Sequence, residues 1–516
     1  MAARSTVVGI DLGTTDIIAA CVARKGVDIV QNSVSERRTP ALLSFTSRRR
    51  LIGDAALSQL RSNFRSSCRD LKHLVGCSTD SPDLATERFW SLCPLGRAKD
   101  GHVGFQVSCR GEERILSASA CLSMLITRII FMSQAWTKVS VKDAVLSIPS
   151  YVDEVRRLAF LDALRIAGVN CLQLLHESTA IALAWRMEHR DFDDSQPILM
   201  AFCSCGHSGL MVAIARYEKN AVTILGEAYD RTVGGRDMDR VVLDLFAESL
   251  RKQGAPDPLG NGKALLKLEE AATKVKKTLS VVDEAKGTAE CVVEDYDLSC
   301  TVRRKNFEEI CQPLYEKAKT VAASALAAAG VGVEDLSRVE IVGGSSRTPW
   351  LQRALLEVFA PLELQTTLNA DEAVARGCAW QAAMVSPLVR LEPMQVTGFL
   401  HWAGVELEWG EESEATADAT DETPEVVGVR RLPVFGTGAG PGSSAEVRLT
   451  GRGPVTLVAV RLDAGDLRTP IGTWNIDFPA AAASLAVIQC AVDCNGFFRV
   501  EGAQITCEEQ PPEVAA

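Results

Sequence analysis

Residues 7–16 read VVGIDLGTTD, and this stretch says more about the fold than any other part of the chain. Its apolar first four residues predict a buried strand that leads into a turn. In that turn, Gly13 lets the backbone approach a bulky anion because it carries no Cβ. Thr14 and Thr15 add hydroxyls beside backbone N–H groups, and Asp11 can hold a metal-bound water, so the turn can cradle a phosphate. The alternative is an ordinary tight turn after a core strand.

The composition is that of a globular protein with several domains. The chain has 516 residues, of which 47% are hydrophobic and 23% charged, and this length predicts roughly two to four domains. A net charge of −11 argues against direct binding to nucleic acid or to an acidic membrane, since phosphates need a basic face. The N-terminus shows no secretory signal, and the apolar run 122–132 contains Arg128 and is too short to span a bilayer. The sequence therefore predicts a cytoplasmic protein, in the cytosol, with the nucleus as an alternative.

The chain contains 16 cysteines and no C-x-x-C motif. In a protein without a secretory signal we expect them to be reduced. Cys203, Cys205 and His207 alternate, so an extended strand would point all three to one face. A metal or redox site there is one interpretation, but the paired spacing of such sites is absent, and small core residues are the favoured one.

Hydrophobic periodicity predicts an α/β region up to residue 385. A strand–turn–strand pattern at 196–216 repeats the pattern of the N-terminus, and further strands are expected at 141–148 and 339–342. Helices are expected at 116–139, 153–167, 263–281, 306–329 (with Asn306 and Glu309 as a capping signature), 351–359 and 371–385. Two such α/β units that face each other would form a cleft with a phosphate turn on each wall.

Helical periodicity nearly vanishes after Pro387. Strand-like runs predict a small β domain at 397–508, separated by a linker at 386–396 from a nucleotide-binding domain at 1–385. The segment 411–425 has seven acids and no base, so we expect a disordered loop there and a disordered tail at 509–516. The strand-like runs are 455–462, 472–478, 485–492 and 497–505.

The order of these motifs resembles the 70-kDa heat-shock chaperone superfamily. The resemblance covers roughly residues 5–387 and rests on eight stretches in family order: 10–15, 70–76, 148–151, 176–180, 233–239, 276–280, 342–349 and 371–377. It implies an α/β, actin-like, two-lobed ATPase domain followed by a small all-β, sandwich-like domain. The helical lid that follows this domain in conventional members is not expected in this chain.

The resemblance also implies a site for ATP or ADP with Mg²⁺. Lys72 and Glu177 would be the catalytic residues: Lys72 would reach the terminal phosphate, and Glu177 would act through a Mg²⁺-bound water or position the nucleophile. Asp11 would hold the Mg²⁺ through water, and Pro149 matches the switch proline of the family. The residues expected to bind the nucleotide are Asp11, Gly13, Thr14, Thr15, Gly206, His207, Gly234, Gly235, Lys276, Lys277, Ser280, Gly343, Gly344, Ser345, Arg347 and Asp371.

The second phosphate loop departs from the family pattern. Active members carry an acid, a threonine and a second acid where this chain has Ser204, Gly209 and Met211, although Gly206 remains. Without two carboxylates around the metal and the water, the transition state loses several kcal/mol, or about a thousandfold in rate. The sequence therefore predicts that ATP is bound and is hydrolysed weakly or not at all.

Two subgroups of the superfamily share further features with this chain. Gly-His-Ser at 206–208 and the region after 385 resemble the 110-kDa branch, and the architecture resembles atypical ribosome-associated members that pair with a J-domain protein. These resemblances imply a heat-shock co-chaperone that assists protein folding through a conventional 70-kDa chaperone, by nucleotide exchange, or through a J-domain protein at the ribosome. Unfolded polypeptide is a candidate ligand of the β domain. The alternatives are an ATP-hydrolysing foldase and a non-chaperone scaffold with a relic cleft.

Overall fold

A computed structural model describes residues 5–23, 26–189, 196–389, 391–392, 394–402, 404–410, 416–417, 429–436, 439–463, 467–480 and 484–507. The chain divides into two compact units, Met1–Val396 and Thr397–Ala516. The acidic loop expected at 411–425, apart from 416–417, and the tail expected at 509–516 lie outside the described residues. We describe the two units separately.

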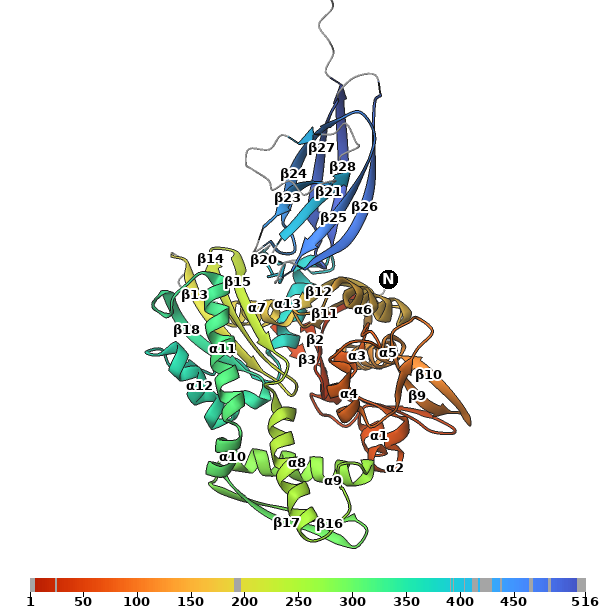
Figure 1. The fold of residues 1–516 in the computed structure, drawn as a ribbon, viewed down its shortest axis with the longest axis vertical. Coiled ribbons are helices and arrows are strands. Elements are labelled where there is room, and N and C mark those ends of the chain that lie inside the picture. Colours follow the sequence, from red (N-terminus) through yellow and green to blue (C-terminus); the bar gives the residue numbers. More distant parts are fainter. Residues whose placement is uncertain are drawn as a thin grey trace, which may run out of the picture. The chain divides into compact units, whose positions relative to one another are not determined.

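Two six-stranded sheets of the same design form the first unit (Figure 1). The first sheet runs in the order β12 (Asn170–His176), β11 (Ser140–Ile148), β1 (Ser5–Leu12), β2 (Asp16–Ala23), β3 (Gly26–Ile29), with β4 (Thr39–Pro40) beside β2. The second runs in the order β19 (Leu364–Gln365), β18 (Leu336–Val342), β13 (Ile198–Cys205), β14 (Leu210–Glu218), β15 (Ala221–Asp230), β20 (Gln395–Thr397). We call the parts built on these sheets lobe I (5–189) and lobe II (196–372).

The strand pairing confirms the internal repeat expected from the sequence. β1 pairs parallel with β11 and antiparallel with β2, and β13 pairs parallel with β18 and antiparallel with β14. Each lobe therefore presents the turn after its first strand at the carboxyl end of parallel strands. Ligands of α/β folds bind at this end.

Helices α5 (Ala118–Thr137) and α6 (Glu154–Ile166) belong to lobe I. α6 begins after Asp153, whose side chain accepts a hydrogen bond from Arg156 N, and Gly168 follows its end with φ 72°. α5 is longer than the apolar run seen in the sequence, and its length and composition alone would let it cross a membrane. Leu122, Leu125 and the other residues of its inward face are fully buried, so α5 is a core helix of this lobe.

Residues 43–117 form a smaller part of lobe I. It contains two three-stranded sheets, ordered β6-β5-β7 and β10-β9-β8, and the short helices α3 (Leu71–Leu74), which carries Lys72, and α4 (Leu84–Ser91). The strands are β5 (Leu43–Phe45), β6 (Arg50–Ile52), β7 (Ser67–Cys68), β8 (Leu95–Arg97), β9 (Val103–Cys109) and β10 (Glu112–Ser117).

Lobe II carries most of the remaining helices, and one prediction for it was wrong. The single helix expected at 306–329 is two helices, α10 (Arg304–Ile310) and α11 (Gln312–Ala329), and Asn306 lies inside the first instead of capping it. Pro313 causes the break, because a residue without an N–H fits only the first turn of a helix. The other elements are α8 (Gly235–Lys252), α9 (Gly262–Leu279), the hairpin of β16 (Glu284–Val293) and β17 (Tyr296–Arg303), and α12 (Pro349–Phe359).

Helices α7 (Glu177–Glu188) and α13 (Ala373–Val385) pack against each other with their backbones in close contact. A Cβ on Gly377 would lie 1.8 Å from Ala180 O of α7. On its other side α13 contacts β1, where a Cβ on Gly9 would lie 2.0 Å from Ala379 N. Gly9 therefore sets how closely α13 packs on β1, and Gly377 sets how closely it packs on α7.

The second unit is a β domain with two four-stranded sheets. Leu407 and Leu457 of one sheet share a core with Val447 and Ile488 of the other, as in a sandwich. The strands expected from the sequence are present, and the described part of this unit contains no helix. The first sheet runs β23 (Val429–Phe435), β21 (Gly404–Gly410), β25 (Gly453–Leu462), β26 (Arg468–Phe478), and the second β22 (Thr416–Ala417), β24 (Ser444–Gly451), β27 (Ser484–Val492), β28 (Phe498–Cys507).

Candidate functional site

A cavity of about 950 Å³ lies between the two lobes. All the predicted site residues line it except Gly234 and Gly235, and Pro149 lines it as well. Lobe I contributes Asp11, Gly13, Thr14, Thr15, Lys72 and Glu177, while Gly206, His207, Lys276, Lys277, Ser280, Gly343, Gly344, Ser345, Arg347 and Asp371 come from lobe II. Residues that are up to 360 positions apart in the sequence thus share one cavity, as the resemblance implied.

The first loop is held at the end of β1 by the neighbouring strand. Ser147 of β11 donates a hydrogen bond of 3.1 Å from its Oγ to Asp11 Oδ1 and accepts one of 3.0 Å from Leu12 N. A Cβ on Gly13 would lie 2.5 Å from Asp16 O, so the turn has room only for glycine. The Asp11 carboxylate and the Thr14 and Thr15 hydroxyls therefore face the cavity from a fixed turn.

The deep end of the cavity holds one cation between two carboxylates. Lys72 on α3 forms an ion pair with Glu177, the first residue of α7. Burial and then the Glu177 charge raise the pKa of Asp11 to about 7. Burial lowers the pKa of Lys72, but Glu177, Tyr151 and Asp11 raise it by more, so Lys72 stays protonated. A protonated lysine beside carboxylates is a suitable group for a phosphate with its hydrated metal ion.

The second loop faces the first without any carboxylate of its own. Ser204 and Met211 are paired residues on β13 and β14, and both line the cavity. Between them, Gly206 N donates a hydrogen bond of 3.1 Å to Gly209 O and closes the turn. Burial and the nearby Lys276 charge lower the pKa of His207 to about 3, so this imidazole is neutral. The wall contributed by this loop is polar and uncharged.

Gly234 and Gly235 lie behind the second loop instead of lining the cavity. Gly235 N donates a hydrogen bond of 3.0 Å to Gly206 O. A Cβ on Gly234 would lie 2.4 Å from Gly209 N. These contacts show that both glycines support the loop, and a Cβ on Gly235 would also lie 2.7 Å from Ser345 Oγ, which lines the cavity. The contact of both glycines with a nucleotide stays a prediction.

The outer end of the cavity has a glycine floor and charged side chains at its rim. Gly343 has φ 84°, and its Cβ would lie 2.3 Å from Cys205 O, so only glycine fits there. Arg347 Nη2 lies 3.4 Å from Asp371 Oδ2 across this floor. Lys276, which is only 8% exposed, is held in place inside the cavity wall, because its ammonium lies 2.9 Å from Asp239 Oδ1. A flat floor with polar edges suits a planar base and its sugar.

His73 is a site residue that the sequence analysis missed. It follows Lys72 on α3, is 1% exposed, and places Nε2 2.7 Å from Ser208 Oγ in the second loop. Burial and the surrounding arginines hold the pKa of His73 well below its usual value. Its position inside the matching stretch 70–76 was the only available signal, since Ser208 lies 135 residues away.

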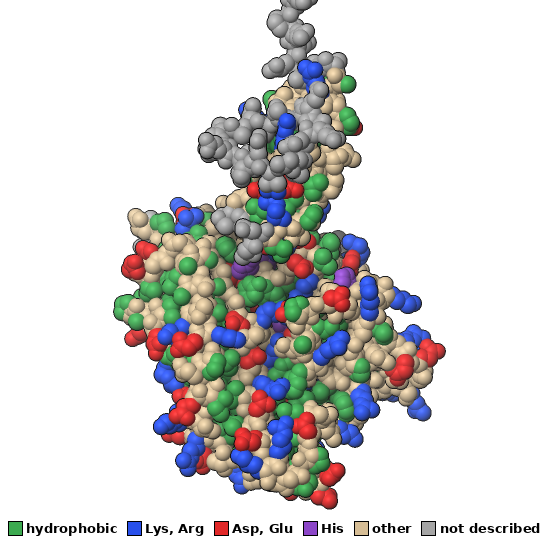
Figure 2. Space-filling model, in the orientation of Figure 1, with side chains coloured by type: hydrophobic (Ala, Val, Ile, Leu, Met, Phe, Trp, Pro, Cys, Tyr) green, Lys and Arg blue, Asp and Glu red, His purple; other side chains and the backbone are tan. Residues whose placement is uncertain are grey.

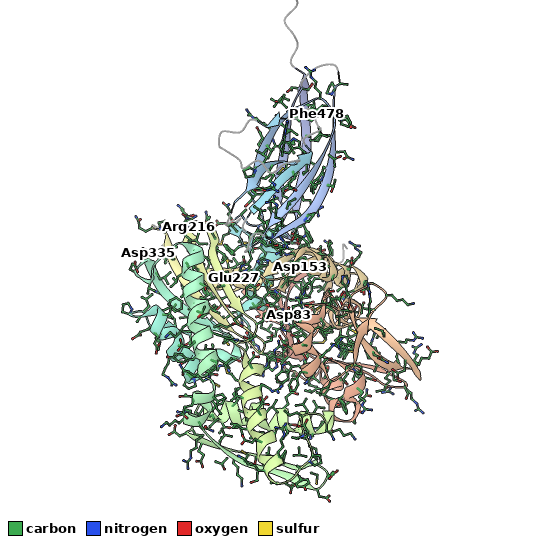
Figure 3. All side chains as sticks on the ribbon, viewed as in Figure 1. Asp83, Asp153, Arg216, Glu227, Asp335 and Phe478 are labelled. Carbon is green, nitrogen blue, oxygen red and sulfur yellow. The ribbon has the colours of Figure 1, made fainter. Side chains whose placement is uncertain are left out.

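Buried polar contacts join the lobes beside the cavity. Glu87 on α4 accepts two hydrogen bonds of 3.0 Å from Arg236 on α8. Glu227 on β15 accepts a hydrogen bond of 2.5 Å from Ser178 and another from Ser150. Figure 3 labels Glu227 and, on the lobe I side, Asp83, which pairs with Arg231 just after β15. The two lobes are therefore held together by charged groups as well as by packing.

The cysteine cluster seen in the sequence belongs to the core. Cys203 and Cys205 point to the same face of β13, as predicted, but this face is the buried core of lobe II. Burial raises the pKa of the Cys205 thiol to about 12 and that of Cys203 still further. His207 lies beyond the end of the strand, and no group of three or more His, Cys, Asp or Glu among the described residues can hold a metal ion directly.

Charged side chains of both signs are interspersed over the face of the molecule drawn in Figure 2. Blue and red side chains alternate there, and the described residues show no broad basic area on this face. This distribution agrees with the net charge of −11.

Comparison with known proteins identifies the family. The model of the Hsp70 protein family matches residues 7–505. A heat shock protein homolog from Naumovozyma castellii is 34% identical over 412 residues, which is 80% of this chain and 60% of the relative. Heat shock 70 kDa protein 14 from Arabidopsis thaliana is 32% identical over 511 residues, or 98% of this chain and 60% of the relative. Heat shock 70 kDa protein 4L from Homo sapiens is 34% identical over 407 residues, which is 78% of this chain and 48% of the relative.

The match extends over both units of the structure. The chain spans about 60% of the length of most of the curated relatives it matches. The names of these relatives agree with the likeness to the 110-kDa branch at residues 206–208 and after 385. With an ATPase-type α/β fold, a β-rich C-terminal region and a family match from residue 7 to residue 505, this chain belongs to the Hsp70 family of heat-shock chaperones.

Proposed function

We propose that this chain binds ATP and ADP with Mg²⁺ and hydrolyses ATP weakly or not at all. One observation carries this proposal. The wall of the cavity from lobe I has the acid, hydroxyls, lysine and glutamate of a phosphate site, whereas Ser204 and Met211 face it from lobe II without a carboxylate. A phosphate can be held by one complete wall, but its transfer needs a positioned metal and water on both sides.

The residues present fit a nucleotide with its magnesium ion. Gly13 and Gly343 lie where a Cβ would collide with backbone, so only glycine permits these two turns in the wall of the cavity. Thr14, Thr15 and Lys72 would hold phosphate oxygens, and Asp11 would hold the Mg²⁺ through water. The absence of a direct metal cluster among the described residues suits an ion that is held mainly by phosphate and water.

Weak hydrolysis follows from the two substitutions in the second loop. A serine hydroxyl and a thioether cannot fix a hydrated Mg²⁺ as a carboxylate does. Glu177 lines the cavity and would lie on the phosphate side of a bound nucleotide, but it is paired with Lys72. The loss of several kcal/mol of transition-state stabilisation corresponds to a rate that is about a thousandfold lower.

We further propose that the chain acts as a co-chaperone and not alone. Poor turnover would leave a conventional foldase cycle without its energy source, so nucleotide would act as a conformational ligand. The partner would be a conventional 70-kDa chaperone, in keeping with the likeness to the 110-kDa branch, or a J-domain protein at the ribosome. Unfolded polypeptide on the β domain and a cytosolic location complete the proposal.

The two alternatives are less well supported by the site. An ATP-hydrolysing foldase would need carboxylates at positions 204 and 211. A scaffold with a relic cleft would need none of the side chains that suit phosphate binding, yet Asp11, Lys72 and Glu177 all line one cavity.

Thermal unfolding with Mg²⁺ alone, Mg-ADP and Mg-ATP tests the nucleotide proposal. A ligand at a hundred times its Kd should stabilise the folded state by about 2.7 kcal/mol. We expect this shift in the wild-type chain and a much smaller one in Lys72→Ala, with Lys99→Ala, far from the cavity, as the matched control. No shift in the wild type would favour the scaffold. A shift accompanied by turnover at the rate of a conventional chaperone would favour the foldase.

Affinity capture at low and high salt tests the partner. Ribosomal proteins lost at high salt, together with a J-domain protein that is retained, would support the ribosomal partnership. If a 70-kDa chaperone is recovered and Mg-ATP changes its amount, the result would support a role in nucleotide exchange. Recovery of neither would remove the co-chaperone proposal.

A further inference from the structure

Three side chains join the two phosphate loops directly. Thr14 Oγ1 of the first loop lies 2.6 Å from Ser208 Oγ of the second, and Ser208 Oγ lies 2.7 Å from His73 Nε2. All three residues are buried: Thr14 is 6% exposed, His73 1% and Ser208 8%. We call this set of hydrogen bonds the Thr14–Ser208–His73 bridge.

The chemistry of the neighbours fixes the direction of these hydrogen bonds. Arg231 Nη2 lies 3.5 Å from His73 Nδ1, and an arginine can only donate. Tyr151 OH lies 3.3 Å from the same nitrogen. Nδ1 is therefore the acceptor of a neutral ring, so Nε2 carries the hydrogen and donates it to Ser208. The Ser208 hydroxyl in turn donates to Thr14.

The bridge occupies space that a terminal phosphate would need. A hydroxyl binds a phosphate oxygen at about 2.7 Å, so a phosphate group between Thr14 and Ser208 would hold the two hydroxyls more than about 4 Å apart. The observed 2.6 Å leaves no room for such a group. Thr14 and Ser208 of the bridge line the cavity together with Lys72, and His73 is the direct neighbour of Lys72 on α3.

We propose that the Thr14–Ser208–His73 bridge makes the cavity selective for a nucleoside diphosphate over a triphosphate, with His73 and Ser208 as the specificity-determining residues. This inference rests on the proposed function, namely that the cavity binds nucleotide. A diphosphate anchored at the outer end leaves the bridge intact. A triphosphate has to break it and move the second loop away from the first.

Titration calorimetry of the full chain with Mg-ADP and Mg-ATP tests the inference. Ser208→Ala removes the central hydroxyl of the bridge, and His73→Phe is a second variant that keeps a ring of similar size. Ser67→Ala is the matched control, because it removes a buried serine-to-serine hydrogen bond of 2.9 Å to Ser44 in lobe I outside the cavity.

We expect the wild-type chain to bind Mg-ADP more tightly than Mg-ATP. The ratio of the Kd for ATP to the Kd for ADP should fall by roughly 2- to 10-fold in Ser208→Ala and His73→Phe, which is the effect of one net hydrogen bond, and stay unchanged in Ser67→Ala. In hydrogen exchange of the wild type, Mg-ATP but not Mg-ADP should increase exchange at residues 206–210.

Two results would overturn the inference in distinguishable ways. An unchanged ratio in both bridge variants, with both nucleotides bound, would remove the role of the bridge and leave the proposed function standing. Absence of binding of either nucleotide to the wild-type chain would remove the proposed function and this inference with it.

Discussion

Arg236 and Glu87 form a two-pronged ion pair between the lobes, with both N–O distances at 3.0 Å and both side chains only 1% exposed. The arginine comes from α8 in lobe II and the glutamate from α4 in lobe I. Both charges are shielded from water, so Arg236 depends on Glu87, and Glu87 depends on Arg236 and on Arg231 at 3.8 Å.

Removal of Arg236 alone should therefore be strongly destabilising. We expect Arg236→Met to lower the free energy of unfolding by up to about 3–5 kcal/mol, because it leaves the buried Glu87 carboxylate with only the more distant Arg231, at 3.8 Å, as a cationic partner. The double variant Arg236→Met/Glu87→Gln should recover a large part of this loss. Urea unfolding of the wild type and the two variants measures the free energy of unfolding. Arg251→Met is the control, because the Arg251–Asp257 pair is exposed and worth at most about 1 kcal/mol. A double variant no more stable than Arg236→Met would contradict this account.

Return of carboxylates to the second loop should restore turnover. Ser204→Asp/Met211→Asp puts an acid at both positions that line the cavity opposite Asp11. If the missing metal and water contacts limit hydrolysis, kcat should rise at least about tenfold in the double variant and less in either single one. Phosphate release under single-turnover conditions measures the chemical step. Equal rates in the double variant and the wild type would show that other groups limit the reaction.

The glycines behind the second loop should be far less tolerant than the glycine within it. A Cβ on Gly234 would lie 2.4 Å from Gly209 N and 2.7 Å from His207 O, whereas a Cβ on Gly206 has nothing within 4 Å. We expect Gly234→Ala to lower the melting temperature by several degrees, since a loss of about 1–3 kcal/mol follows from overpacking. Gly206→Ala should melt within about a degree of the wild type. Calorimetry of both variants decides, and equal melting temperatures would refute the supporting role of Gly234.

Asp70 should make the stability depend on pH. Burial raises its pKa from 3.8 to about 6, against the opposing effect of Arg69. The folded state therefore holds this proton more tightly than the unfolded chain. The contribution of Asp70 to the free energy of unfolding is full below pH 4 and is lost as the pH rises through 6. Asp70→Asn keeps the neutral shape, and asparagine tolerates the φ of 59° at this position.

The free energy of unfolding of Asp70→Asn, relative to the wild type, should increase by ~1–3 kcal/mol between pH 4 and pH 7. Urea unfolding at several pH values measures the difference. The exposed Asp80→Asn serves as control, and the difference between this variant and the wild type should stay flat. A flat difference for Asp70→Asn too would mean that the carboxyl is ionised normally in the folded state.

Most of the fold could be predicted because its signals are local. Strand β11 and helix α6 follow directly from alternating and helical hydrophobic patterns, with Asp153 and Gly168 as end signals. The repeat of the two sheets was visible because the same strand–turn–strand pattern occurs twice. The helix predicted at 306–329 failed at a local signal that was overlooked, since Pro313 marks a helix start.

The site was less accessible to such reasoning because its contacts are remote in the sequence. The importance of His73 depends on Ser208 and Tyr151, neither of which can be located from a pattern around residue 73. Gly234 and Gly235 occur in a stretch typical of nucleotide-binding relatives, but only the packing of α8 behind the second loop shows that they support it. Motifs therefore identified which residues gather at the cavity, and the three-dimensional contacts separated those that line it from those that stand behind it.

The glycine contacts of α13 bear on how a signal can leave the cavity. Gly9 lies against Ala379, and Gly377 lies against Ala180. At these two points no side chain separates the backbone of α13 from that of β1 or α7. The helix therefore lies in direct backbone contact with both elements, so a movement of the strand that carries Asp11 would displace α13 as well. The chain runs from the end of α13 at Val385 directly into residues 386–396. A displacement of this helix would therefore be passed on to the segment that follows it.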